Sequence, residues 1–185
     1  MADKQIKQFN EETSVSDSDW FLMQKASTDE TVKVSGLSIT ENTTPAKISN
    51  PHKFSVYRDS TQIVAASTFT KIQLSGEDFD TNNNFDSSTN YRYTAPVDGF
   101  YQFTGRVSNN GNGAFIASLF KNGAEFRDGN MFTVASGRSG SQVSDMVQLT
   151  AGDYIELYVY SDNTTIVAPA AYDRPRLSGY LVSRT

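Results

Sequence analysis

From residue 52 to the end of the chain, short apolar runs recur at close intervals, and a turn motif separates each run from the next. The candidate strands are Phe54–Tyr57, Thr68–Leu74, Tyr91–Thr94, Gly99–Val107, Ala114–Lys121, Met131–Ala135, Gln142–Thr150, Tyr154–Tyr160 and Leu177–Ser183. These runs are rich in aromatic and β-branched residues, and none has the period of an amphipathic helix. The pattern predicts an all-β head built from two packed sheets.

The motifs between the runs have the residues that tight turns require. Asn122-Gly123 separates two apolar runs, and both residues tolerate positive φ, so the dipeptide predicts a β-hairpin. Val97-Asp98-Gly99 and Ala151-Gly152-Asp153 have similar turn composition. The chain contains no cysteine, which excludes disulfides, thiolate metal sites and cysteine nucleophiles.

The composition changes near residues 40–52, which predicts three parts: residues 1–40, a linker at 41–51 and a head at 52–185. The first part is acidic and rich in Ser and Thr, but it contains the apolar patches Asp19–Gln24 and Thr31–Val34. These two patches predict a small hairpin. Two strands are marginally stable alone in water, so we expect this hairpin to pack against a partner.

Charge and hydropathy exclude several classes of function. The net charge of −5 and the pI near 4.8 argue against binding of nucleic acid, which requires a basic face. No segment approaches the roughly 20 apolar residues of a membrane-spanning helix. The first ten residues lack the apolar core of a secretory signal, so export by that route is not indicated.

Residues that could perform chemistry are few. His52 is the only histidine, and it lies at the boundary between linker and head with no nucleophile motif beside it. A general base needs a partner that it activates, so the sequence predicts no enzyme activity. We expect His52 to be a half-exposed polar residue.

The acidic segment at residues 75–86 is the one candidate for a metal site. Asp78, Asp80 and Asp86, with neighbouring Asn amides, could form an oxygen cage for calcium. The EF-hand pattern fails, because Asn83 stands where glycine is required and Thr89 stands where the bidentate Glu belongs. A solvated acidic loop is the favoured interpretation, calcium is the alternative, and no other cofactor is expected.

One run of alternating residues indicates a surface for protein contacts. In Tyr154–Tyr160, period two separates aliphatic from tyrosine side chains. The aliphatic face is predicted to point into the core, and it contains Ile155, Leu157 and Val159. The opposite face is predicted to form an interface between subunits, and it contains Tyr154, Tyr158 and Tyr160. Tyr101 and Phe103, in the aromatic run at residues 100–103, are further candidates for this interface.

Several of these segments together resemble the globular head of the complement-one-q-like family. Asn90–Phe103 is similar to the family signature, in which an aromatic residue and a spacer precede the motif Pro-x-x-Gly-x-Tyr-x-Phe. Four other segments are similar to family motifs in the same order: Phe69–Ile72, Ser118–Gly123, Val147–Asp153 and Leu177–Leu181. The resemblance covers residues 52–185. The chain differs from the family in lacking a cysteine before the proline, in having Leu177 for an aromatic residue, and in lacking a Gly-X-Y stalk.

The resemblance implies a ten-stranded jelly roll that forms compact homotrimers, as do the related tumour-necrosis-factor-like heads. Such heads bind proteins or sugars and do no chemistry. The missing collagen-like stalk removes the animal context of the family.

Residues 6–39 are similar to the N-terminal virion-attachment segments of bacteriophage tail fibres and spikes. The resemblance implies a virion structural protein, assembled in the host cytoplasm, whose first 40 residues bind another virion protein. The apolar residues expected to make this attachment are Trp20, Leu22, Val32 and Val34. The head then trimerises, binds a host-surface glycan or protein, or does both. The alternative is a cellular or spore-surface trimeric ligand whose head binds a protein or carbohydrate receptor.

Overall fold

The computed structural model describes residues 20–24, 31–35, 52–110, 112–135, 138–167 and 174–185. The chain divides into two compact units, Met1–Ser49 and Asn50–Thr185. The described residues of both units form strands and turns, and none of them belongs to a helix. Accordingly, no described segment is a helix long and apolar enough to cross a membrane.

In the first unit, β1 (Trp20–Gln24) and β2 (Thr31–Ser35) form an antiparallel pair. This pair confirms the hairpin that the two apolar patches predict. Leu22 lies opposite Lys33, whereas Val32 lies opposite Met23. The apolar residues proposed for attachment are therefore not cross-strand partners of one another. The predicted linker at residues 41–51 lies outside the described residues.

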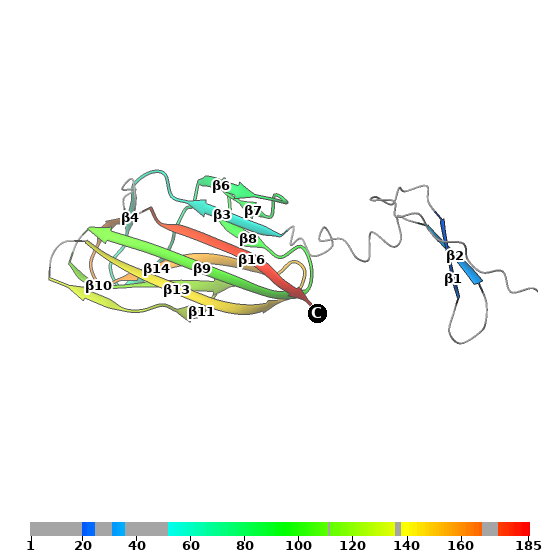
Figure 1. The fold of residues 1–185 in the computed structure, drawn as a ribbon. Helices are drawn as coiled ribbons and strands as arrows, with labels where there is room; N and C mark the ends of the chain where they lie inside the picture. The colour runs from blue at the N-terminus through cyan, green and yellow to red at the C-terminus, as the bar shows by residue number, and fades with distance from the viewer. Residues whose placement is uncertain (1–19, 25–30, 36–51, 111, 136–137, 168–173) are drawn as a thin grey trace, which may run out of the picture. The chain divides into compact units, whose positions relative to one another are not determined.

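The second unit is a sandwich of two antiparallel sheets (Figure 1). Five strands of the seven-stranded sheet follow the order β11-β10-β14-β8-β7. The other two are β12, which pairs with β10, and β5, which pairs with β14. Its strands are β5 (Thr68–Lys71), β7 (Phe85–Asp86), β8 (Arg92–Thr94), β10 (Gly113–Lys121), β11 (Ala124–Asp128), β12 (Phe132–Val134) and β14 (Tyr154–Ser161).

The five-stranded sheet has the order β13-β9-β16-β3-β6. Its strands are β3 (Lys53–Tyr57), β6 (Gly76–Asp80), β9 (Gly99–Asn110), β13 (Arg138–Leu149) and β16 (Arg176–Arg184). A small separate ribbon pairs β4 (Gln62–Val64) with β15 (Thr165–Val167). This architecture is the all-β sandwich that the recurring apolar runs predict.

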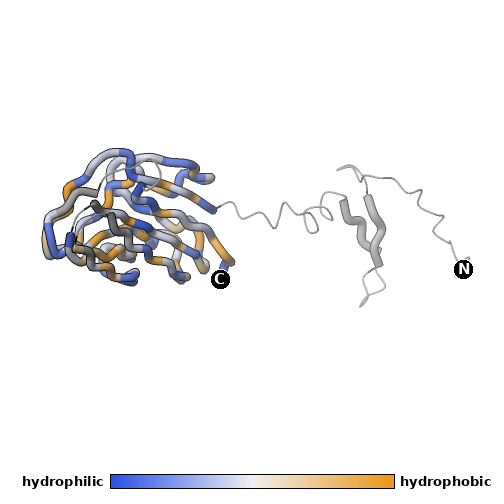
Figure 2. The backbone as a smooth tube through the Cα atoms, turned by 60° about the vertical axis from the view of Figure 1, so that its left-hand side comes forward, coloured by the Kyte–Doolittle hydropathy of each residue, from blue (hydrophilic) through white to orange (hydrophobic). Residues whose placement is uncertain are grey.

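Alternation of apolar and polar residues forms one core between the two sheets (Figure 2). Ile155, Leu157 and Val159 of β14 are fully buried in this core, as the sequence pattern predicts. Burial of a large apolar side chain contributes about 1.5–3 kcal/mol to stability. Stacked aromatic rings occupy one region of the core, where Phe54 lies 4.5 Å from Tyr93 between ring centroids.

The predicted hairpin at Asn122-Gly123 is confirmed. Both residues have positive φ, of 53° and 79°, and they connect β10 to β11. The sequence pattern missed β11 itself, because its five residues, Ala124–Asp128, are mostly exposed and polar. This strand forms because the hairpin turn positions it to complete backbone hydrogen bonds with β10.

The acidic segment at residues 75–86 is also more ordered than a solvated loop. Gly76–Asp80 forms β6 at the edge of the five-stranded sheet, and Phe85–Asp86 forms β7 at the edge of the other sheet. Phe85 is buried in the core, which fixes the end of this segment. Edge strands can be polar on both faces, so alternation did not identify them.

Candidate functional site

The tyrosines of β14 lie on the outward face of the seven-stranded sheet, opposite the core. Tyr154, Tyr158 and Tyr160 are half-buried, as period two predicts. They do not project freely into solvent. Phe120 stacks on Tyr158 with ring centroids 3.8 Å apart, and Phe69 lies 5.5 Å from Tyr160.

This face therefore consists of rings that pack against one another within the chain. Phe69 also contacts Phe120 edge-on at 5.3 Å, and the Arg92 guanidinium lies 4.1 Å from the centre of the Tyr154 ring. Because the neighbouring rings already cover much of their surface, less apolar area remains for a second protein. We call this set, Phe69, Phe120, Tyr158 and Tyr160, the outer aromatic cluster.

A buried carboxylate lies among the rings of the same face. Glu156 is only 3% exposed, and it forms an ion pair with Lys71. Its second oxygen, Oε2, has no hydrogen-bond partner among the described residues. Burial and the neighbouring Glu156 raise the pKa of the Tyr158 hydroxyl above its ordinary value. The centre of this face is thus neutralised internally by the ion pair.

The prediction that Tyr101 and Phe103 form the subunit interface is wrong. Both side chains are fully buried in the core of a single chain, where Phe103 packs against Tyr93 and Phe54. The Tyr101 hydroxyl donates a hydrogen bond of 2.8 Å to the carbonyl oxygen of Val97. Neither side chain can reach a second subunit without leaving the core.

Most of the exposed large apolar side chains among the described residues lie on the strands of the five-stranded sheet. They are Phe79, Phe100, Met146, Tyr180 and Val182. Their exposure is substantial, at 46% for Phe79 and 49% for Tyr180. The register brings them together, because Met146 and Tyr180 both lie opposite Gln102 of the central strand β9.

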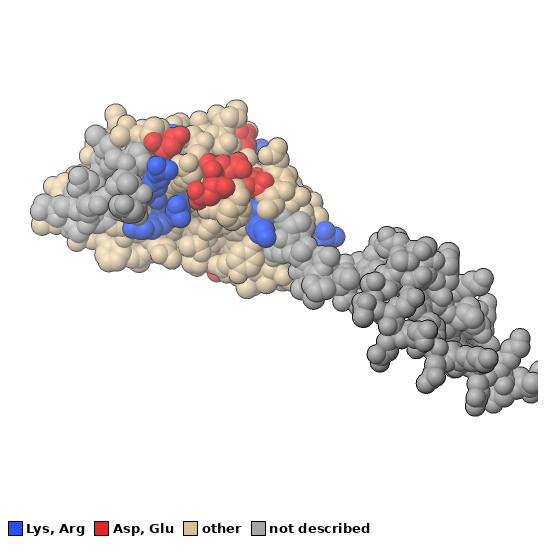
Figure 3. Space-filling model, turned by 45° about the horizontal axis from the view of Figure 1, so that its top comes forward, with Lys and Arg blue, Asp and Glu red and all other residues tan. Residues whose placement is uncertain are grey.

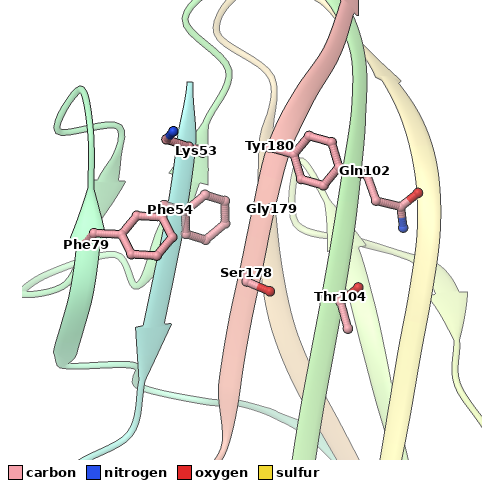
Figure 4. Close-up of a pocket in the computed structure, with 8 residues that line it drawn as sticks. All are labelled: Lys53, Phe54, Phe79, Gln102, Thr104, Ser178, Gly179 and Tyr180. Carbon is pink, nitrogen blue, oxygen red and sulfur yellow. The ribbon is translucent and has the colours of Figure 1, made fainter. Parts of the chain in front are cut away.

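A hollow of about 210 Å³ opens on this face between Phe79 and Tyr180 (Figure 4). Its lining is Lys53, Phe54, Phe79, Gln102, Thr104, Ser178, Gly179 and Tyr180. Gly179 is required here, because a Cβ atom at this position would lie 2.7 Å from Cδ1 of Phe103. Lys53 is the one charged residue of the lining.

Several polar side chains in the middle of this face have hydrogen-bond partners within the chain. A continuous row across the sheet consists of Ser144, Thr104, Ser178 and Ser55. The Thr104 and Ser144 hydroxyl oxygens lie 3.1 Å apart, and Gln102 Nε2 donates to Ser144 Oγ at 3.0 Å. Polar groups that already have partners are less costly to remove from water. The face can therefore be covered by another protein surface at a low desolvation penalty.

The comparisons with known proteins support the architecture of the head. No protein-family model matches the sequence, and a search of curated proteins finds no match. Among solved structures, the chain is similar to the globular domain of zebrafish complement 1qA protein, with 18% identity, a TM-score of 0.56, and coverage of 72% of this chain and 99% of that chain. Eiger TNF from S. frugiperda has 6% identity and a TM-score of 0.60, with 74% and 96% coverage. Murine APRIL has 10% identity and a TM-score of 0.52, with 70% and 99% coverage.

The head has this jelly-roll fold. The complement-one-q-like and tumour-necrosis-factor-like architecture that the ordered motifs predict is thus confirmed. The similarity of residues 6–39 to tail-fibre attachment segments stays a prediction. So does the role of Trp20, Leu22, Val32 and Val34 in attachment.

The three carboxylates considered for calcium do not converge. Asp78 accepts a hydrogen bond from Ser55 Oγ at 2.9 Å, and Asp80 accepts one from the Phe85 backbone N–H at 2.7 Å. Asp86 instead caps its own turn at residues 88–90. Among the described residues, no three or more His, Asp or Glu side chains gather where they could hold a metal ion.

The environment of His52 differs from the half-exposed position expected. The residue is buried, and burial followed by the nearby Arg184 charge lowers the pKa of its imidazole. Its backbone oxygen accepts a hydrogen bond of 2.9 Å from Leu181. These contacts attach the start of β3 to β16.

Sequence reasoning missed the exposed apolar face of the five-stranded sheet. The segment at residues 99–103 has aromatic residues at both parities, so alternation alone could not separate Phe100, which is exposed, from Tyr101, which is buried. A usable signal was present in Leu177–Val182. There the exposed residues Tyr180 and Val182 alternate directly with the core residues Leu177 and Leu181.

Proposed function

We propose that this chain is a non-enzymatic binding protein whose head forms a homotrimer through the outward face of the five-stranded sheet. Residues 1–40 attach the trimer to a larger assembly, and the head presents a surface to a protein or glycan. The head resembles complement-one-q-like heads, and residues 6–39 resemble fibre attachment segments. Together these resemblances favour a bacteriophage tail fibre, head fibre or adaptor. In that case the protein is a virion component assembled in the host cytoplasm.

The observation that carries the homotrimer is the concentration of exposed apolar side chains on one sheet face. Phe79, Phe100, Met146 and Tyr180 all lie on strands of the five-stranded sheet. Large exposed apolar surfaces on soluble proteins mark sites of association. The family resemblance supplies the stoichiometry, because the related heads form compact homotrimers.

This location replaces the outer aromatic cluster as the preferred interface, and one substitution on each face separates the two. Tyr180→Asp places a carboxylate in each of three equivalent contacts, where an unpaired charge costs several kcal/mol. We expect loss of the trimer, measured as a shift in mass by multi-angle light scattering at micromolar concentration. Tyr158→Asp should leave the mass unchanged, because that ring packs on Phe120 within the chain.

Ile63→Asp provides the matched control, since Ile63 is the most exposed large apolar residue in the described part of the chain and lies on β4, outside both main sheets. A trimer that survives Tyr180→Asp but not Tyr158→Asp would place the interface on the tyrosine row of β14. A monomeric wild-type protein would refute the proposed assembly altogether.

The attachment role is supported by the size of the N-terminal hairpin and by its resemblance to fibre attachment segments. A two-stranded hairpin is marginal in water, so a partner surface is expected for β1 and β2. Deleting residues 1–45 should leave the head folded and trimeric but absent from assembled particles. Normal incorporation of the truncated protein would contradict this role.

The second candidate function is a cellular or spore-surface trimeric ligand. The similarity of the head to complement 1qA and tumour-necrosis-factor proteins favours it equally well. The truncation distinguishes the two, because a free ligand should keep receptor binding and localisation without residues 1–45.

A further inference from the structure

Two arginines face each other at one end of the outward face of the five-stranded sheet. Arg106 of β9 and Arg176 of β16 are direct cross-strand partners, although 70 positions apart in the sequence. Like charges directly opposite in a sheet destabilise it unless a counter-charge is present. This pair therefore concentrates positive charge at one end of the face.

A third arginine extends the same position. Tyr57 of β3 lies directly opposite Arg176 on the other side, and the Arg174 guanidinium lies 4.7 Å from the centre of the Tyr57 ring. This cation–π contact places the Arg174 charge on the ring of the residue that pairs with Arg176. The Arg174 Nε is buried and has no hydrogen-bond partner among the described residues.

The acidic group next to this site compensates only part of the charge. Asp78 Oδ2 lies 3.8 Å from Arg176 Nη2, which is beyond hydrogen-bond length, and it already accepts a hydrogen bond from Ser55. Both members of the pair are about half exposed, so the interaction is weak. Arg106 has an interaction of its own within the chain, so the site depends chiefly on Arg174 and Arg176.

Two hydroxyl groups lie beside the arginines. Thr104 and Ser178, one row along the sheet, are cross-strand partners beside Arg106 and Arg176. On the face shown in Figure 3, basic and acidic side chains lie next to one another. Guanidinium groups with neighbouring hydroxyls match the oxygens of tetrahedral oxyanions, which they bind bidentately.

We propose that Arg174 and Arg176, with Arg106, form a binding site for sulfate or phosphate groups. These oxyanions reach the protein either as substituents of an acidic surface polysaccharide or as free phosphate. The site shares the outward sheet face with the apolar surface around Phe79 and Tyr180, but it lies farther along β9 and β16, one row beyond Thr104 and Ser178. It therefore requires this end of the face to stay uncovered in the proposed homotrimer. It gives the head a ligand chemistry, an anionic group on a glycan, rather than an unspecified partner.

The test uses the full chain and a fluorescently labelled sulfated oligosaccharide, with its unsulfated parent as the control ligand. We expect saturable binding of the sulfated probe that weakens with salt, and no binding of the parent. The double variant Arg174→Gln/Arg176→Gln should weaken binding at least tenfold. Arg127→Gln removes one charge from an exposed pair with Asp145 on other strands, and it should leave binding unchanged.

Competition by inorganic phosphate distinguishes the two sources. Displacement at millimolar phosphate assigns the site to free phosphate, whereas displacement only by the sulfated oligosaccharide assigns it to a glycan. If the double variant fails to fold, the single variant Arg174→Gln replaces it, because the ion pair of Arg176 is then intact. Equal loss in Arg127→Gln, undiminished binding in the double variant, or no saturable binding would each overturn the proposal.

Discussion

Two buried tyrosines in contact with each other provide a test of the core that does not depend on function. Tyr93 and Tyr101 are both essentially inaccessible, and their ring centroids lie 6.0 Å apart. The Tyr101 hydroxyl donates to the Val97 carbonyl oxygen, whereas the Tyr93 hydroxyl has no partner among the described residues. The same change, Tyr to Phe, should therefore have opposite effects at the two positions.

The magnitudes follow from the cost of burying an unpaired polar group. A buried hydroxyl without a partner costs about 1–3 kcal/mol, and Tyr93→Phe removes that penalty while leaving a small void. We expect a net gain of about 1 kcal/mol, or a rise in Tm of about 4 °C for a domain of this size. Tyr101→Phe removes a hydrogen bond and leaves a carbonyl unpaired, so we expect a loss of about 1 kcal/mol.

Differential scanning calorimetry at fixed protein concentration measures both effects, because an oligomer's Tm depends on concentration. Alkaline titration adds an independent readout. Burial raises the pKa of Tyr93, so above about pH 10 the unfolded chain releases this proton more readily and stability falls as the pH rises. Tyr93→Phe should reduce that loss. A drop in Tm for Tyr93→Phe equal to that for Tyr101→Phe would refute the reasoning, because it would mean that the Tyr93 hydroxyl is hydrogen-bonded.

Three further predictions concern the acidic segment and the sheet face. Hydrogen bonds from the Thr89 and Ser88 backbone N–H groups lower the pKa of Asp86. The carboxylate therefore stabilises the folded state above about pH 4, and this stabilisation is lost as the pH falls further. In thermal melts from pH 2 to 7, Asp86→Asn should therefore lower the Tm at pH 7 but converge with the wild type in acid; a constant difference would contradict this. Addition of calcium or of a chelator should leave the Tm unchanged, because the candidate carboxylates do not converge; a calcium-dependent rise would show a site. Gly179→Ala should destabilise by about 1–3 kcal/mol in chemical denaturation, because the added Cβ overlaps Phe103, and a neutral result would show that the ring can move.

The local features of this protein are determined by the sequence. Alternation within Tyr154–Tyr160 separates the core face from the tyrosine face, and Asn122-Gly123 determines a hairpin, because both signals depend only on neighbouring residues. The recurrence of such runs predicted an all-β sandwich, and the resemblance of the ordered motifs to the complement-one-q-like head implied the jelly roll. No distant contact had to be known for these predictions.

The candidate sites were decided by contacts between strands that are distant in the sequence. Whether Tyr101 points into the core depends on the sheet that packs over β9, and the pattern at residues 99–103 fits both directions. Arg106 becomes the neighbour of Arg176 only through the register of β9 and β16. Asp78 and Asp86 are close in sequence, but strand pairing places them on different sheets, where each side chain has hydrogen-bond partners of its own. Local patterns specify the face of each strand, whereas the pairing of strands, set by packing of the whole core, determines which faces carry a site.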